Sequence, residues 1–249
     1  MRAALKTRVV LTFALVLTGQ FAGVGRVTAA DSPEASSTVT ICAHNYARVD
    51  DKTMEKAEKV AAGIFRKVGV GIRWVDIDLT SEGKSERSLG KEVFALCRIH
   101  LNIFPHKMAE RLDVPGNAMG LAPGSETDRQ VVYIFYDRVE AISQTQLEAQ
   151  IERRIDRFAS KSQILGHVIA HEIGHLLLNI ESHSKTGIMR GVWDPNDLRD
   201  AAFGYLVFTP QQAEGILTEV VRRASRQELL VGVGLESSAE TMPVITTSK

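Results

Sequence analysis

The chain has 249 residues, of which 44% are apolar and 24% charged, so it is long enough to bury a substantial core and has the composition of an ordinary globular protein. Its 30 Lys and Arg balance 30 Asp and Glu, and a chain without basic excess does not point to nucleic acid as a partner. These values, together with only 2 Cys, exclude a fully disordered chain, a collagen-like chain and a domain held by a disulfide framework.

Residues 1–30 have the pattern of a secretory signal peptide. Basic residues precede an apolar run over 9–17, and small residues close the segment at Thr28, Ala29 and Ala30. The run is too short to span a bilayer comfortably, and the alternative is an uncleaved membrane anchor. Cleavage near Ala30 removes four cations and no anions, which leaves an exported chain of formal charge −4. We therefore expect a secreted or periplasmic protein with no stable membrane insertion after signal cleavage.

This compartment bears on Cys42 and Cys97, because an oxidising environment would allow the two thiols to pair. The alternative is two buried free thiols on strands. Neither the spacing of the two residues nor their context determines the geometry that a disulfide needs, so the sequence leaves both states open.

A strand–helix–strand unit follows a short polar leader over 31–37. Alternating apolar residues predict a strand over 38–46, and apolar residues of helical period predict a helix from about Thr53 to Gly69. A second strand is expected over 70–77. Two strands joined by one helix at this length indicate a right-handed crossover between parallel strands.

Three more strands are expected before the next strong helix. A polar loop over 80–91 leads to a strand over 98–104, and a short run over 118–122, bounded by Gly and Pro, is typical of an edge strand. The continuous apolar run over 131–136 predicts a central strand covered on both faces. Many charges with mixed periodicity over 144–158 indicate a solvated surface helix.

The last third of the chain contains two predicted helices. Strong apolar periodicity predicts the first over 162–178. Thr209 begins a capping pattern, with Pro at the first helical position, for a second helix that runs to about Arg223. The segment 190–208 between them shows no periodic pattern, and the composition of 229–249 indicates a disordered tail.

Four of the seven His fall between 167 and 183, and two of them form the pattern His171-Glu172-Ile-Gly-His175. Residues four apart on a helix lie one turn apart on the same face, so His171 and His175 can reach one metal ion. Imidazole is a usual nitrogen ligand of Zn²⁺. Glu172 is rotated from this face by about 100°, which places it beside a water on the metal, where a general base would act.

The stretch from His171 to Met189 resembles a metzincin metallopeptidase, and is most similar to the matrixin type. That family carries His-Glu-x-x-His-x-x-Gly-x-x-His followed by a Met turn. His183-Ser184 resembles the third ligand and its neighbour, and 187–189 (Gly-Ile-Met) resembles the Met turn. The expected order of strands is similar to the upper part of the family's fold, and 120–124 is similar to the edge strand that lies against bound peptide.

The spacing departs from the family pattern at one place. Seven residues separate His175 from the next His, whereas the family has five. In strict register the family's Gly is Leu178, and Asn179, which tolerates the left-handed conformation that ends a helix, comes one residue later. A helix and a loop that are each one residue longer would keep His183 as third ligand, whereas strict register would place Glu181 there. We prefer His183, because the Ser after it and the nearby Met match the family.

The resemblance implies an exported zinc-dependent endopeptidase in one α/β domain over 38–228. Its fold would be metzincin-like: a twisted mixed sheet with an edge strand, an active-site helix, a small irregular lower part and a C-terminal helix. The partner would be a peptide or protein substrate, and the sequence indicates no oligomeric state. The implied site comprises a Zn²⁺ ion on His171, His175 and His183, the general base Glu172, the Met-turn residue Met189, and substrate-binding Gly120, Leu121 and Ala122.

Alternatives remain for the function and for individual residues. The chain could be a non-hydrolytic zinc-binding or partner-binding extracytoplasmic domain of the same fold, although a structural zinc site needs no base such as Glu172. In other zinc peptidases the third ligand is a Glu from a later helix, and here Glu214 or Glu219 on the last helix would take that role. Trp193 is either a wall of the substrate pocket or part of an ordinary turn. The remaining histidines are expected to be structural: His44, His100, His106 and His167.

Overall fold

The computed structural model describes residues 37–77, 97–112, 114–123, 130–153, 158–180 and 183–239. The signal segment, the polar loop over 80–91, Glu181 and the last ten residues lie outside this description. Among the described helices, none is long and apolar enough to cross a membrane.

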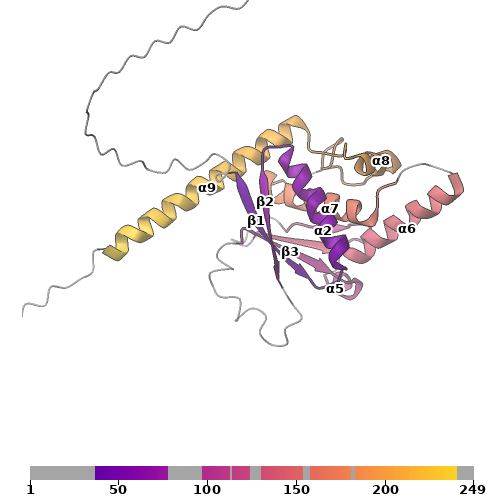
Figure 1. The fold of residues 1–249 in the computed structure, drawn as a ribbon, viewed down its shortest axis with the longest axis horizontal. Coiled ribbons are helices and arrows are strands. Elements are labelled where there is room, and N and C mark those ends of the chain that lie inside the picture. The colour runs from indigo at the N-terminus through magenta and orange to yellow at the C-terminus, as the bar shows by residue number, and fades with distance from the viewer. Residues whose placement is uncertain are drawn as a thin grey trace, which may run out of the picture. The chain divides into compact units, whose positions relative to one another are not determined.

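Five strands form one mixed sheet in the order β2-β1-β3-β5-β4 (Figure 1). The strands are β1 (Thr38–Asn45), β2 (Gly71–Ile77), β3 (Ile99–Phe104), β4 (Gly120–Leu121) and β5 (Val131–Phe135). β1, β2, β3 and β5 pair in parallel, whereas β4 is antiparallel to β5 and forms the edge. The predicted α/β class, the parallel crossover and the short edge strand are confirmed.

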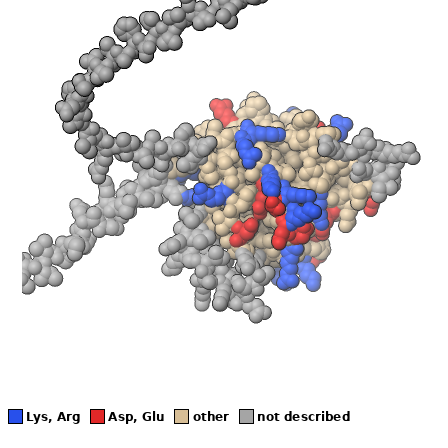
Figure 2. Space-filling model, in the orientation of Figure 1, with Lys and Arg blue, Asp and Glu red and all other residues tan. Residues whose placement is uncertain are grey.

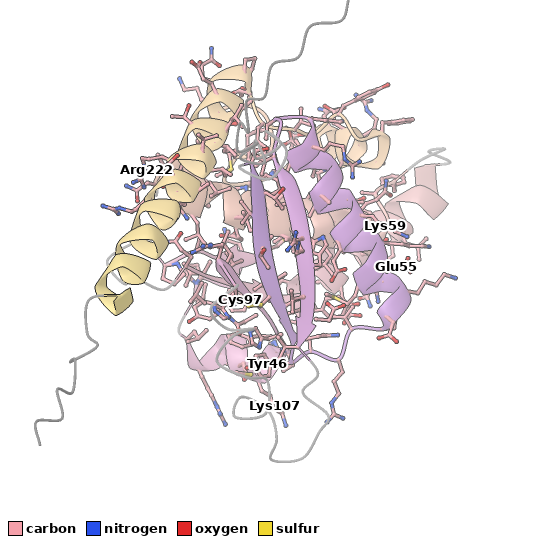
Figure 3. All side chains as sticks on the ribbon, turned by 60° about the vertical axis from the view of Figure 1, so that its left-hand side comes forward. Tyr46, Glu55, Lys59, Cys97, Lys107 and Arg222 are labelled. Carbon is pink, nitrogen blue, oxygen red and sulfur yellow. A yellow bond between two sulfur atoms is a disulfide. The ribbon has the colours of Figure 1, made fainter. Side chains whose placement is uncertain are left out.

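Helix α2 (Asp51–Arg66) makes the crossover between β1 and β2. Asp50 caps its start, because the Asp50 side chain accepts a hydrogen bond from the backbone N–H of Thr53. Its buried face is the apolar stripe read from the sequence and packs on the sheet. Its outer face is charged and includes the exposed ion pair of Glu55 and Lys59 (Figure 3).

Helix α7 (Lys161–Leu178) carries the His-Glu-x-x-His pattern and is buried on nearly all sides. Ser160 and Gln163 form a capping box at its start, and Asn179 ends it in the left-handed conformation with φ 51°. This confirms that the helix ends at Asn179. α7 crosses α2 closely at Gly166, where a Cβ atom would lie 2.5 Å from the carbonyl oxygen of Ala57.

Four helices differ from the sequence prediction or were not predicted. α5 (His106–Arg111) was missed, and α6 (Tyr136–Arg153) begins eight residues earlier than expected because β5 passes into it without a loop. α8 (Pro195–Phe203) lies in the segment that shows no periodic pattern. α9 (Pro210–Ala239) starts with the predicted capping box of Thr209 and Gln212 but extends well beyond Arg223.

The core lies between the sheet and helices α2 and α7, where alternate residues of β1, β3 and β5 are buried. Cys42 on β1 is joined to Cys97, just before β3, in a disulfide with a Cα–Cα distance of 5.6 Å (Figure 3). This bond is consistent with the oxidising compartment that the N-terminal segment predicts. On the face drawn in Figure 2, basic and acidic side chains are interspersed, as the balanced charge leads one to expect.

Candidate metal centre

Three histidines converge next to helix α7. His171 and His175 lie one turn apart on α7, and His183 comes from the chain just after it. One ring nitrogen of each lies within 4.8 Å of the others, so the three side chains could hold one metal ion. The ring of His183 is centred 5.4 Å from that of His171 and 5.0 Å from that of His175. The long spacing before His183 therefore does not keep it from the pair on the helix.

Two backbone carbonyls orient the rings of the helical pair. His171 Nδ1 donates a hydrogen bond to the carbonyl of Ile188 at 2.7 Å, and His175 Nδ1 donates to that of Ile180 at 2.8 Å. A carbonyl only accepts, so Nδ1 carries the hydrogen in both rings and Nε2 carries a lone pair. Carbonyl partners of this kind are the usual means by which metal-binding histidines are oriented.

The donor set fits a cation. The Nε2 atoms of His171 and His175 lie only 3.0 Å apart, and two lone pairs at this distance repel each other unless a positive charge is shared between them. A proton is a poor candidate for that charge. Burial lowers the pKa of His171 to about 4, although its hydrogen bond to Ile188 opposes the change, and burial also lowers the pKa of His175. Neutral imidazoles with converging lone pairs are what a metal ion requires.

Glu172 lines the same cavity as the three histidines. Its side chain is only 7% exposed, and burial raises its pKa to about 8. A carboxyl whose pKa lies near neutrality is suited to accept a proton and return it. Its place on the helix, one residue after His171, follows directly from the sequence pattern.

Met189 lies in the turn that brings His183 to the helix. This turn is closed by a hydrogen bond from the backbone N–H of Ser184 to the carbonyl of Met189, at 2.9 Å. The Met189 side chain is fully buried, and its sulfur lies against Gly174, where a Cβ atom would be 2.7 Å away. The glycine in the His-Glu-x-x-His pattern therefore makes room for the Met turn.

A cavity of about 560 Å³ opens beside the histidines. The edge strand and the segment before it line this cavity, and so do residues 190–193 after the Met turn. The three residues expected to bind substrate all line this cavity: Gly120, Leu121 and Ala122. The cavity thus lies between an edge strand and the candidate metal ligands.

Trp193 is the site residue whose role the sequence leaves undecided. It lines the cavity, and its indole N–H donates to the carbonyl of Ile188 at 3.1 Å. Its ring meets the edge of the His171 ring, with centroids 5.9 Å apart. No sequence signal pointed to the carbonyls of Ile188 and Ile180 as partners of the histidines, because backbone groups carry no residue signature.

Ion pairs of Arg190 hold the segment that follows the Met turn. Arg190 pairs with Asp194 at 2.9 Å and with Asp197 at 2.5 Å, and these two carboxylates also form the capping box of α8. Asp at the cap, Pro at the next position and Asp two residues later are a helix-start signal that could have revealed α8 in the sequence. This cluster holds one wall of the cavity in place.

The other candidate ligands that the structure describes are not part of the histidine group. His167 is buried, and its Nδ1 donates to the carbonyl of Gln163. Glu219 is held by Arg222 and Arg223, whose hydrogen bonds lower its pKa to about 2. Within the described ranges, the only group of three or more candidate ligand side chains is His171, His175 and His183. Glu181 lies outside the described residues.

No family model matches this chain, and no curated protein shows significant similarity to it. What is shown is an α/β protein with a mixed five-stranded sheet and a group of three histidines that could hold a metal ion. Membership of the metzincin family remains a prediction from the motif.

Proposed function

We propose that the protein is an exported zinc-dependent endopeptidase of the metzincin type. The observation that carries the proposal is the convergence of His171, His175 and His183 beside a buried carboxyl, Glu172, in a cavity bounded by an edge strand. A closed structural zinc site would use a fourth protein ligand and would need no carboxyl of this kind. A catalytic site keeps three protein ligands and an open position.

The roles of the side chains follow from their placement. The three imidazoles hold the ion through ring nitrogens, and the carbonyls of Ile188 and Ile180 keep two of them in the tautomer that can bind metal. When bound, the zinc ion supplies Lewis acidity to the carbonyl that is hydrolysed. The Glu172 carboxylate accepts a proton from the attacking water and delivers it to the nitrogen of the leaving amine.

The substrate lies along β4. This two-residue strand ends the sheet, and Gly120 and Leu121 face the cavity from it. An extended peptide that adds to this edge is held by its own backbone, so such a site recognises a peptide strand rather than a particular side chain. A peptide bound along β4 would have one of its peptide bonds next to the three histidines.

Cleavage of casein by the purified, zinc-loaded protein tests the proposal. We expect cleavage that a chelator abolishes and that added zinc restores. Glu172→Ala should retain the fold and zinc binding but lose the rate contribution of a general base, which is about 10²–10⁴-fold. Glu148→Ala, at an exposed position of helix α6, serves as a variant that should behave as the unmodified protein. Chelator-insensitive cleavage, or full activity of Glu172→Ala, would contradict the mechanism, and zinc binding without cleavage of any protein would favour a binding domain.

A further inference from the structure

The edge strand and the candidate base are in unusually close contact. A Cβ atom placed on Gly120 would lie 2.5 Å from Cγ of Glu172, 2.7 Å from its Cδ and 2.6 Å from its Oε1. Real carbon atoms do not approach this closely without bonding, so any side chain at position 120 would occupy the space of the Glu172 carboxyl. Glu172 can lie where it does only because residue 120 is glycine.

The strand itself has little freedom to move away. Gly120 and Leu121 pair with Ile134 and Tyr133 of β5, and the backbone N–H of Phe135 donates to the carbonyl of Met119 at 2.9 Å. The side chain of Arg138 on α6 donates to the three carbonyls that precede the strand, those of Val114, Pro115 and Ala118. The backbone around Gly120 is therefore tied on both sides.

Backbone conformation does not explain the glycine. Among the described residues with positive φ are Gly69, Gly187 and Gly204, but Gly120 is not one of them. Alanine at position 120 would therefore meet no conformational penalty, and the obstacle is the Glu172 side chain alone. Glu172 in turn is nearly buried, so an added methyl group would force its carboxyl out of the place it now occupies.

We propose that Gly120 is a positioning residue: by lacking a side chain, it leaves the space that sets the Glu172 carboxyl beside the three histidines. The role in hydrolysis rests on the proposed function, whereas the packing relation between the two residues does not. A shift of about 1 Å in a reacting group can cost about 10²-fold in rate, so this single contact is large enough to control activity.

Gly120→Ala tests the catalytic part. With casein as substrate, we expect kcat to fall about 100-fold while KM and zinc affinity each stay within about threefold of the unmodified protein. Gly116→Ala is the matched control, because it lies in the same segment and a Cβ atom there has no neighbour within 4 Å. A rise in KM with unchanged kcat would show that Gly120 only contacts substrate and would overturn the proposal, as would full activity of Gly120→Ala.

A stability cycle tests the packing without any assay of activity. In the zinc-loaded protein, Gly120→Ala should lower Tm by about 2 °C or more, because the methyl group and the Glu172 side chain compete for one space. In the Glu172→Ala background that space is free, so the same substitution should leave Tm unchanged or raise it. Equal Tm changes in the two backgrounds would overturn the proposal. If the unmodified protein cleaves no casein, the proposed function fails, and this cycle still decides the relation of Gly120 to Glu172.

Discussion

His171 and Trp193 share one hydrogen-bond acceptor, the carbonyl oxygen of Ile188. His171 Nδ1 donates to it at 2.7 Å and the Trp193 indole N–H at 3.1 Å, and the two rings are nearly perpendicular, in a T-shaped contact. Ile188 immediately precedes Met189, so the Met turn, one wall of the cavity and a candidate metal ligand are joined at a single backbone group. The orientation of His171 thus depends on residues distant from it in sequence.

Trp193→Phe should weaken zinc binding by up to about tenfold, the lower end of the effect of removing groups that orient metal ligands. Phenylalanine keeps a ring against His171 but loses the N–H that fixes the Ile188 carbonyl. A competition titration with a chromophoric chelator measures the change. Val192→Ala, at the exposed neighbouring position, should bind zinc as the unmodified protein does. Unchanged affinity of Trp193→Phe would mean that the carbonyl is held without the indole.

His183→Ala should reduce zinc affinity by more than about 100-fold, because loss of a direct ligand exceeds the effect of losing an orienting group. Glu181→Ala, two residues away, should bind zinc normally. The same titration compares the two variants. The opposite result, with loss of binding only in Glu181→Ala, would establish the strict family register and remove His183 from the site.

The disulfide should contribute about 2–4 kcal/mol to the free energy of unfolding. It closes a loop between residues 55 positions apart, and the cross-link lowers the entropy of the unfolded chain. The combined variant Cys42→Ala, Cys97→Ala should therefore unfold at lower urea concentration. The unmodified protein, when its disulfide is reduced by excess dithiothreitol, should unfold at the same urea concentration as the variant. Coincident unfolding curves of the oxidised protein and the variant would show that the bond adds no stability.

Glu58 should make the protein less stable as the pH rises. Burial raises the pKa of this carboxyl from 4.5 to about 7, and the nearby Asp76 carboxylate adds to the increase. The folded state therefore holds the proton more tightly than the unfolded chain, so the stability from this group is complete below pH 4.5 and is lost as the pH rises towards 7. Glu58→Gln, which stays neutral, should raise Tm at pH 8 by about 2–4 °C, the size expected for a partly screened group.

The effect of Glu58→Gln should be much smaller at pH 5, and thermal scans of the metal-free protein at both pH values measure it. Asp76→Asn removes the neighbouring charge and should reduce the pH dependence as well. An equal gain in Tm at pH 5 and pH 8 would show that Glu58 does not titrate between the two values.

The elements with a local signal are the ones that the sequence predicts well. Apolar residues of helical period predict α2 and α7, and Asn179 ends α7 where its tolerance of positive φ suggested. His171, Glu172 and His175 follow from the helical repeat, because residues four apart lie on one face whatever surrounds the helix. α8 has a capping signal at Asp194 and Asp197, but apolar periodicity does not reveal it, because a helix of nine residues shows little of such a period.

The sequence by itself determined that two imidazoles and a carboxyl lie on one buried helix, because that relation depends only on the geometry of the helix. Tertiary structure alone decided that His183 joins them, that the Ile188 carbonyl sets the tautomer of His171, and that Gly120 leaves room for Glu172. These relations join segments separated by a loop, a turn or a strand, whose positions are set by packing and backbone hydrogen bonds. Packing between distant segments and hydrogen bonds of the backbone leave no periodic pattern in the sequence.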